Sequence, residues 1–280
     1  MKINIVRPNG EHSGIFAEWA EVLYFSLLDL GHEVHISLSQ SMSDSLNIVI
    51  GIFHSNQFLD SLKDDTIIIN TEPLFGRQNN LEWTHKVIHY AKRYQIWDYD
   101  LRNIQIFEGL GVHGVQLFRF GYQKQLERIQ ARPDTERPMD VLFYGSTNLR
   151  RKIILDQIHS KKLRLGTLFN SYGIERDEQI SKSKLVINMH HEDVGSFEIV
   201  RIHYLLNNGV AVLSEVSATT SIESRFFPCI AISTYSDFAD NCLALIEDPD
   251  SLNSLREKAL IEFKKFPQAD FMEKLIQNSQ

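Results

Sequence analysis

Short apolar runs alternate with amphipathic stretches along most of the chain, and this alternation limits the folds open to it. The runs at 2–6, 33–38 and 47–53 are rich in β-branched and apolar residues, as in strands buried on both faces of a sheet. Residues 15–30 repeat apolar side chains at helical spacing, and Gly31 follows as a stop. Strands and helices that alternate in this way form open parallel sheets with right-handed crossovers. The pattern therefore predicts an α/β fold.

A charge-dense stretch at 123–138 interrupts the alternation and ends at a proline. The chain of 280 residues is long enough for two domains. We predict two doubly wound Rossmann-like domains, 1–122 and 139–250, that face each other across a cleft and are joined by this linker. Residues 251–280 are predicted to form a C-terminal helix that packs back on the N-terminal domain. Further strands are predicted at 66–70, 95–99, 114–120, 140–144, 163–168, 185–189, 210–214 and 229–232. Further helices are predicted at 83–94, 149–159, 175–182, 197–208 and 235–246.

Composition and charge exclude several classes of protein. The hydrophobic share of 43% and the charged share of 23% are those of a globular chain. The net charge of −7 provides no global basic field, so we do not expect a nucleic-acid partner. Cys229 and Cys242 are too few for a disulfide framework. The chain begins with a predicted strand, and no window approaches the roughly 20 apolar residues of a transmembrane segment. We therefore expect a cytoplasmic protein.

A strand, a turn of small residues and a helix follow one another in the second predicted domain. The turn consists of Gly145, Ser146 and Thr147, and the helix opens with Arg150 and Arg151. A helix N-terminus directs free backbone N–H groups and a positive dipole at an anion, and arginine suits a diphosphate. We interpret the turn as a donor-phosphate site; an ordinary tight turn is the alternative. Neighbouring helical residues diverge by about 100°, so only one of the two arginines is expected to reach the phosphates.

The next strand and helix of this domain carry a second polar group. The strand at 185–189 is followed by His190, His191, Glu192 and Asp193, and the helix carries Glu198 and Arg201. We expect Arg201 to contact the donor phosphates or ribose, and Glu198 to contact sugar or ribose hydroxyls. The alternative is a surface ion pair three residues apart. His191 is predicted to contact the sugar or phosphate. Successive strand residues face opposite ways, so the four residues after the strand are not expected to share a metal.

Two residues of the first predicted domain are candidates for a general base. His12 lies in the loop after the first strand and has an ordinary pKa near neutrality. Glu72 follows another predicted strand and is the competing candidate. A solvated loop residue is the alternative for His12.

Three segments, Asp140–Lys152, Gly173–Asp177 and Ser196–Glu215, resemble the C-terminal domain of GT-B glycosyltransferases. The resemblance is to the glycosyltransferase group 1 and spore-maturation glycosyltransferase-like members. It implies a nucleotide-sugar donor held mainly by the second domain, an acceptor facing the first domain, and no obligatory metal. Many relatives carry a donor-binding glutamate pair at the places of Ser196 and Tyr204, so this chain departs from the pattern and its ribose contact stays unassigned.

The resemblance and the motifs together predict a metal-independent glycosyltransferase that moves a sugar from a nucleotide-sugar to a hydroxyl acceptor. The acceptor would be a glycan, a glycolipid or a small molecule, and the nucleotide-sugar is a co-substrate, so no cofactor is expected. An Asp-x-Asp pattern at 98–100 resembles the metal motif of the GT-A fold, but a strand end in the first domain explains it better. A nucleotide-sugar epimerase on the same scaffold and a non-enzymatic doubly wound ligand-binding module remain the alternatives.

Overall fold

A computed structural model describes residues 1–9, 13–51, 62–76, 81–193 and 195–279. The chain divides into two compact units, and each is built on a parallel sheet. Unit 1 combines Met1–Gln123 with Pro267–Gln280, and unit 2 is Lys124–Phe266. The predicted α/β class with two doubly wound sheets is confirmed.

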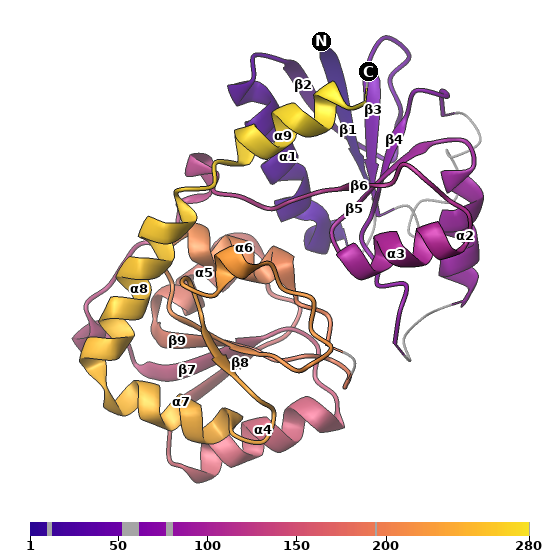
Figure 1. The fold of residues 1–280 in the computed structure, drawn as a ribbon. Coiled ribbons are helices and arrows are strands. Elements are labelled where there is room, and N and C mark those ends of the chain that lie inside the picture. The colour runs from indigo at the N-terminus through magenta and orange to yellow at the C-terminus, as the bar shows by residue number, and fades with distance from the viewer. Residues whose placement is uncertain (10–12, 52–61, 77–80, 194, 280) are drawn as a thin grey trace. The chain divides into compact units, whose positions relative to one another are not determined.

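The sheet of unit 1 has six parallel strands in the order β2-β1-β3-β4-β5-β6 (Figure 1). The strands are β1 (Lys2–Arg7), β2 (Glu33–Leu38), β3 (Leu46–Ile50), β4 (Ile67–Asn70), β5 (Gln95–Asp98) and β6 (Gln116–Leu117). The inner strands β3 and β4 are almost entirely buried, as expected of strands covered by helices on both faces. The helices are α1 (Ala17–Asp29), α2 (Leu81–Ala91), α3 (Leu101–Gly109) and α9 (Gln268–Gln277).

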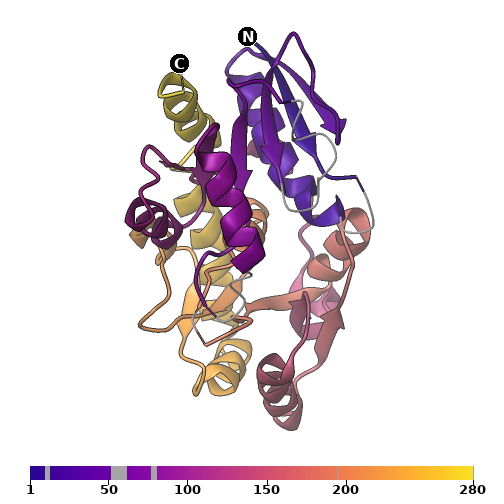
Figure 2. The same cartoon turned by 90° about the vertical axis from the view of Figure 1, so that its right-hand side faces the viewer.

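Helices cover both faces of this sheet (Figures 1 and 2). Helices α2 and α3 bury Val87 and Phe107 against Val49, Ile68 and Ile96. On the other face lies α1, and α9 packs beside it.

Gln268, at the first position of α9, fastens the end of the chain to unit 1. Its side chain is fully buried. Its Oε1 accepts from Gly121 N at 2.5 Å, and its Nε2 donates to Arg119 O at 3.0 Å. Residues 267–280 therefore belong to the same unit as residues 1–123, although about half of the chain separates them.

Two elements of unit 1 differ from the sequence-based prediction. The strand predicted at 114–120 is shorter in the structure, where β6 spans Gln116–Leu117 and one further backbone bond joins Phe118 N to Asp98 O at 2.7 Å. The aromatic side chains of this segment pack on α1. The rings of Phe118 and Phe120 lie 5.3 and 4.6 Å from the ring of Trp19. Helix α3 is not predicted. It begins after Asp100, whose side chain accepts from a backbone N–H of the first turn.

The sheet of unit 2 has five parallel strands in the order β11-β10-β9-β7-β8. The strands are β7 (Met139–Tyr144), β8 (Leu165–Leu168), β9 (Ser183–Asn188), β10 (Val212–Glu215) and β11 (Ala231–Ser233). The helices are α4 (Leu149–Ser160), α5 (Gly173–Ser181), α6 (Ile199–Asn207), α7 (Phe238–Glu247) and α8 (Pro249–Phe263). Helices α4 and α7 cover one face, whose core includes Val141, Phe143, Ile154, Leu185 and Phe238, and α5 and α6 cover the other (Figure 1).

The segment predicted as a linker lies against α6 of unit 2. The backbone N–H groups of Arg128 and Ile129 both donate to Asn208 Oδ1, at 2.7 and 2.8 Å. Asn208 also donates to Leu126 O at 2.9 Å. The end of α6 therefore holds the first part of this segment, residues 126–129, on unit 2.

Parallel pairing brings polar strand ends together in unit 2. Strands β7 and β9 are neighbours, with Val141 opposite Leu185, so both end at the same edge of the sheet. Strand β10 pairs with the other side of β9 and ends at this edge as well. Ligands of open α/β sheets bind at this carboxyl edge. No helix in the described parts of the chain is long and apolar enough to cross a bilayer.

Candidate functional site

The turn after β7, Gly145–Thr147, lies beside the side chain of Arg201. Gly145 has φ +128°, a conformation that favours glycine, and a Cβ built there would lie 2.7 Å from Arg201 Nη2. Arg201 comes from the first turn of α6, and its Nη1 donates to Asn188 Oδ1 at 2.7 Å. Ser146 and Thr147 are exposed beside it. The structure therefore brings together the small-residue turn and Arg201, which are 56 residues apart by their numbers.

Arg151 is buried behind this turn. Its side chain is only 4% exposed. The guanidinium donates to Met189 O at 2.6 and 3.1 Å, to Ser146 O at 2.8 Å and to Glu198 Oε1 at 2.9 Å. Burial lowers the pKa of Arg151 to about 10, with Glu198 opposing the shift, so the group carries its charge at neutral pH. Arg151 thus joins the turn, the end of β9 and the start of α6.

Glu198 stands at the start of α6 with its side chain 21% exposed. Its Oε2 accepts from Asn188 Nδ2 at 3.0 Å and lies 3.6 Å from His190 Nδ1. Burial alone would raise the pKa of Glu198, but the neighbouring His190 and the charges of Arg201 and Arg151 hold it below its usual range. Glu198 is therefore an anion inside a basic cluster.

Arg150 points to a different carboxylate. It pairs with Glu215 through both of its terminal nitrogens and with Asp193 Oδ1 at 3.0 Å. Glu215 ends β10 and is almost fully buried. The guanidinium also lies 4.0 Å from the ring centroid of Tyr235. Arg150 and Arg151 therefore diverge as helical neighbours do, and each binds main-chain or carboxylate groups at the strand ends.

The two histidines after β9 play different parts. His190 is fully buried, and its ring contacts Ser196 O at 2.8 Å and Thr220 Oγ1 at 2.9 Å. His191 is partly buried, and its carbonyl accepts from Asn148 Nδ2 at 2.6 Å. Burial and the nearby Arg151 lower the pKa of His191, so its ring is neutral at pH 7. Across the described ranges no group of three or more His, Cys, Asp and Glu side chains could hold a metal ion.

Tyr204 stands where many relatives carry a glutamate, and it binds a carboxylate from α5. Its hydroxyl donates to Asp177 Oδ2 at 2.6 Å. Arg176 Nη2 donates to Asp177 Oδ1 at 2.7 Å, and its guanidinium lies 4.3 Å from the centroid of the Tyr204 ring. Burial and Asp177 both raise the pKa of Tyr204, so the phenol stays protonated. Asp177 thus places a negative charge beside this position.

The candidate bases of unit 1 are described in part. His12 lies outside the described residues. Glu72 follows β4 and is partly buried, and burial raises its pKa to about 7. A carboxyl group with this pKa can accept a proton at neutral pH. Asp98 is fully buried and accepts hydrogen bonds, and Asp100 pairs with Arg102 at 2.8 Å, so both carboxylates of the Asp-x-Asp pattern bind protein groups.

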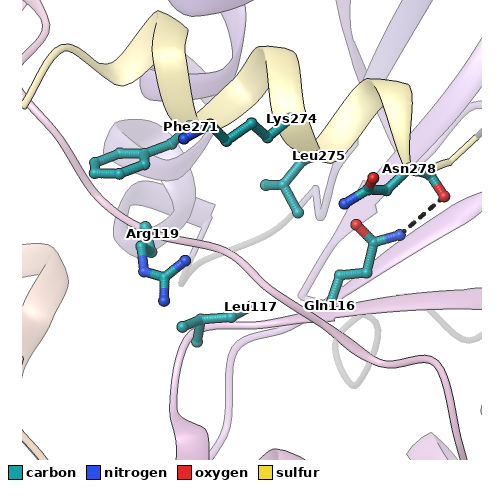
Figure 3. Close-up of a pocket in the computed structure, with 7 residues that line it drawn as sticks. All are labelled: Gln116, Leu117, Arg119, Phe271, Lys274, Leu275 and Asn278. Carbon is teal, nitrogen blue, oxygen red and sulfur yellow. Dashed lines mark hydrogen bonds between the residues drawn. The ribbon is translucent and has the colours of Figure 1, made fainter.

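Unit 1 also contains a small cavity of about 250 Å³ between β6 and α9 (Figure 3). Arg119 and Lys274 contribute basic groups to it, and Leu117, Phe271 and Leu275 contribute apolar surface. Gln116 Nε2 donates to Asn278 O at 3.3 Å across one end. None of the site residues predicted from the sequence lines this cavity.

Two residues of the unit 2 site are not among the predicted ones. Asn188 contacts Glu198, Arg201 and also Ser214 Oγ at 3.0 Å, so it connects the ends of β9 and β10 to α6. Glu215 binds Arg150 and accepts from His190 N at 2.9 Å. Both are polar residues at the last position of a buried apolar strand, and this signal is visible in the sequence.

Comparisons with known proteins bear on the fold. No protein-family model matches the chain. An uncharacterized protein of Acanthamoeba polyphaga mimivirus, L140, is 24% identical over 240 residues, which cover 83% of this chain and 74% of the relative. An alpha-glucosyltransferase solved with UDP and a 13-mer DNA containing an HMU base superposes with a TM-score of 0.71 at 11% identity, over 100% of this chain and 99% of that chain. HepE of Anabaena, solved with UDP and glucose, gives 0.66 at 11% identity, over 99% and 98% of the chains. The chain therefore has the GT-B fold of these glycosyltransferases.

Proposed function

We propose that this chain is a metal-independent glycosyltransferase that transfers a sugar from a nucleotide-sugar to a hydroxyl acceptor. The contact of Arg201 with the glycine turn after β7 carries the proposal. It places a guanidinium beside exposed small residues at the N-terminus of a twelve-residue helix. Backbone N–H groups, a helix dipole and a guanidinium are the groups that bind a diphosphate. The GT-B fold of the chain supports this reading.

The donor would bind with its diphosphate at Gly145–Thr147 and Arg201. Arg151 holds the turn and the start of α6 together, because it donates to both Ser146 O and Glu198 Oε1. Glu198 would accept hydrogen bonds from the sugar or the ribose, and His191 would contact the sugar or phosphate as a neutral ring. Positive groups at the diphosphate would stabilise the charge that grows on the leaving nucleotide. UDP is the first nucleotide to test, since HepE and the alpha-glucosyltransferase were solved with it.

We assign the acceptor to unit 1, with Glu72 or His12 as the base. In this step the acceptor O–H gives its proton to the base while the acceptor oxygen bonds to the anomeric carbon. The bond from that carbon to the β-phosphate oxygen breaks, and the nucleoside diphosphate leaves with the electron pair. A glycan, a glycolipid or a small molecule would serve as the acceptor. Two free, buried cysteines agree with a cytoplasmic location.

A thermal-shift screen tests the donor assignment. Binding to the native state raises Tm, so the screen compares sugar nucleotides based on UDP, GDP, ADP, TDP and CMP. Arg201→Ala should abolish the shift. Arg164→Ala is the matched control, because Arg164 pairs with Asp140 at the opposite edge of the same sheet. Equal shifts in Arg201→Ala and the wild type would remove Arg201 from the donor site.

Product analysis separates the proposed transferase from other functions of the same scaffold. Incubation without acceptor gives slow donor hydrolysis for a transferase and a new sugar isomer for an epimerase. Tight nucleotide binding without turnover, across a panel of donors and acceptors, would indicate a ligand-binding module.

Nucleic acid is a second candidate acceptor, favoured by the alpha-glucosyltransferase structure that contains DNA. The net charge of −7 counts against it. Binding of a DNA duplex that weakens steeply with salt would support it, because released counterions make such binding salt-dependent. No binding of the duplex at low salt would leave carbohydrate and small-molecule hydroxyls as the acceptors.

A further inference from the structure

Asp98 is a buried carboxylate of unit 1 that the proposed reaction does not use. It ends β5 and is fully buried. Its Oδ2 accepts from Asn70 Nδ2 at 2.7 Å, and Asn103 Nδ2 lies 3.1 Å from each of its oxygens. Asp100 N donates to Oδ1 at 2.8 Å. Burial raises the pKa of Asp98 to about 8, and the donors Asn70, Asp100 N and Asn103 oppose this rise. Because each of these partners donates to it, the carboxyl group of Asp98 sets the direction in which the two asparagine amides point.

The two asparagines use their amides to hold the main chain around Glu72. Asn70 Nδ2 donates to Glu72 O at 2.8 Å, and Asn103 Nδ2 donates to the same oxygen at 3.0 Å. Their oxygens face the other way: Asn70 Oδ1 accepts from Glu72 N at 3.3 Å, and Asn103 Oδ1 accepts from Leu74 N at 2.7 Å. Four hydrogen bonds thus fix the backbone on both sides of Glu72.

Only one orientation of each asparagine side-chain amide fits these hydrogen bonds. An asparagine amide flipped by half a turn would place its oxygen against the Asp98 carboxylate and its NH₂ group against backbone N–H groups. Asp98 therefore selects the one orientation of Asn70 and Asn103 in which Glu72 O, Glu72 N and Leu74 N are all satisfied.

We infer that Asp98, Asn70 and Asn103 form a clamp that positions the Glu72 carboxyl group for proton transfer. The inference rests on the proposed function, with Glu72 as the base. The three are positioning residues, because their bonds reach the main chain of residues 72–74 and not the reacting atoms. A base must stand within hydrogen-bond reach of its proton, and a misplacement of about 1 Å can cost about a hundredfold in rate. Elements far apart in the chain supply the clamp, since Asn70 ends β4 and Asn103 lies in α3.

A double-mutant cycle in the full-length protein tests the clamp. The rate of UDP release from UDP-glucose, with water as acceptor, is measured for Glu72→Gln, Asn103→Ala and the double variant. Asn103→Ala should lower kcat about ten- to a hundredfold and leave the KM for UDP-glucose within about twofold. In the Glu72→Gln background the same substitution should change kcat by less than about twofold, because the group it positions is gone. Asp98→Asn keeps the volume and should repeat this behaviour.

The matched control is Asn47→Ala. Asn47 is also fully buried and makes several hydrogen bonds, but it lies at the amino end of β3 and contacts Asn4, Met42 and Ser45. Its loss should lower Tm without a selective loss of kcat. If the effects of Asn103→Ala and Glu72→Gln on kcat instead multiply in the double variant, Asn103 acts independently of Glu72 and the inference is overturned. Wild-type kcat in Glu72→Gln would overturn both the clamp and the assignment of Glu72 as the base.

Hydrogen exchange tests the clamp without turnover. The Leu74 amide donates to Asn103 Oδ1, so Asn103→Ala should speed exchange in the peptide around Leu74, and Asn47→Ala should not. Unchanged exchange in Asn103→Ala would overturn the inference. Absence of UDP-glucose binding by the wild type, together with faster exchange in Asn103→Ala, would place the failure in the proposed function and leave the clamp standing.

Discussion

Gly145→Ala is the sharpest test of the donor site, because this substitution disturbs the turn and the arginine together. The backbone at Gly145 has φ +128°, and an L-residue held there costs about 1–3 kcal/mol. The new Cβ would also lie 2.7 Å from Arg201 Nη2, so the guanidinium must move away from the turn. We expect the free energy of unfolding to fall by about 1–3 kcal/mol and the donor phosphates to lose their contact with Arg201.

The loss of affinity follows from the contact that is removed. A hydrogen bond to a charged group contributes about 1.5–3 kcal/mol, and each 1.4 kcal/mol is about tenfold in affinity. Gly145→Ala should therefore weaken UDP binding by about ten- to a hundredfold, as measured by isothermal titration calorimetry. In an Arg201→Ala background the same substitution should weaken UDP binding by much less, because the displaced group is already absent.

A second glycine separates backbone strain from the effect on Arg201. Gly209 has φ +60°, and a Cβ there would lie 3.6 Å from Leu260, at ordinary contact distance. Gly209 follows the C-terminal end of α6, away from the glycine turn. Gly209→Ala should lower stability, measured by urea denaturation, and leave UDP affinity unchanged. UDP affinity in Gly145→Ala within about twofold of the wild type would refute the placement of the diphosphate at this turn.

Three further outcomes are expected. Protonated Glu72 cannot accept a proton, so the rate of UDP release should rise with pH through about 7. In Glu72→Gln this rise should be absent over roughly pH 5 to 9. If the variant keeps the rise, another group is responsible for it. Tyr204→Phe removes one hydrogen bond to the carboxylate of Asp177 and should lower the free energy of unfolding by about 1.5–3 kcal/mol in urea denaturation. No change would show that this bond adds nothing to stability. Gly166→Ala brings a Cβ against the Met139 sulfur and should lower the free energy of unfolding by about 1–3 kcal/mol. UDP affinity should stay the same. A loss of UDP affinity would show coupling between the opposite edges of the sheet.

The regular elements were accessible from local pattern. The strand predicted at 33–38 coincides with β2, and the helix predicted at 149–159 ends one residue short of α4. Hydrophobic periodicity is local information, so strongly periodic segments can be predicted without a partner. Helix α3 shows the limit of this reasoning. Asp100 is its N-cap, but next to Asp98 the same residue also completes an Asp-x-Asp pattern, and only the buried hydrogen bonds of Asp98 distinguish the two interpretations.

The polar network of the candidate site shows a different limit. Asn188 and Glu215 look like ordinary strand ends in the sequence, and their roles depend on which strands are neighbours. Parallel pairing of β9 with both β7 and β10 places them beside α4 and α6. Sheet order is a long-range property, because the paired strands are separated by whole helices.

The amino-acid sequence by itself determined two wound sheets, a glycine turn at a helix N-terminus and a set of basic residues around it. The spacing of apolar residues and the special conformation of glycine are enough for these features. Tertiary structure decided which partner each arginine finds: Arg150 binds Glu215, 65 residues away, Arg151 binds Glu198, 47 residues away, and Arg201 lies over Gly145. The partner of each arginine depends on which strand ends meet at one edge of the folded sheet. A local pattern of residues carries no information about this long-range arrangement.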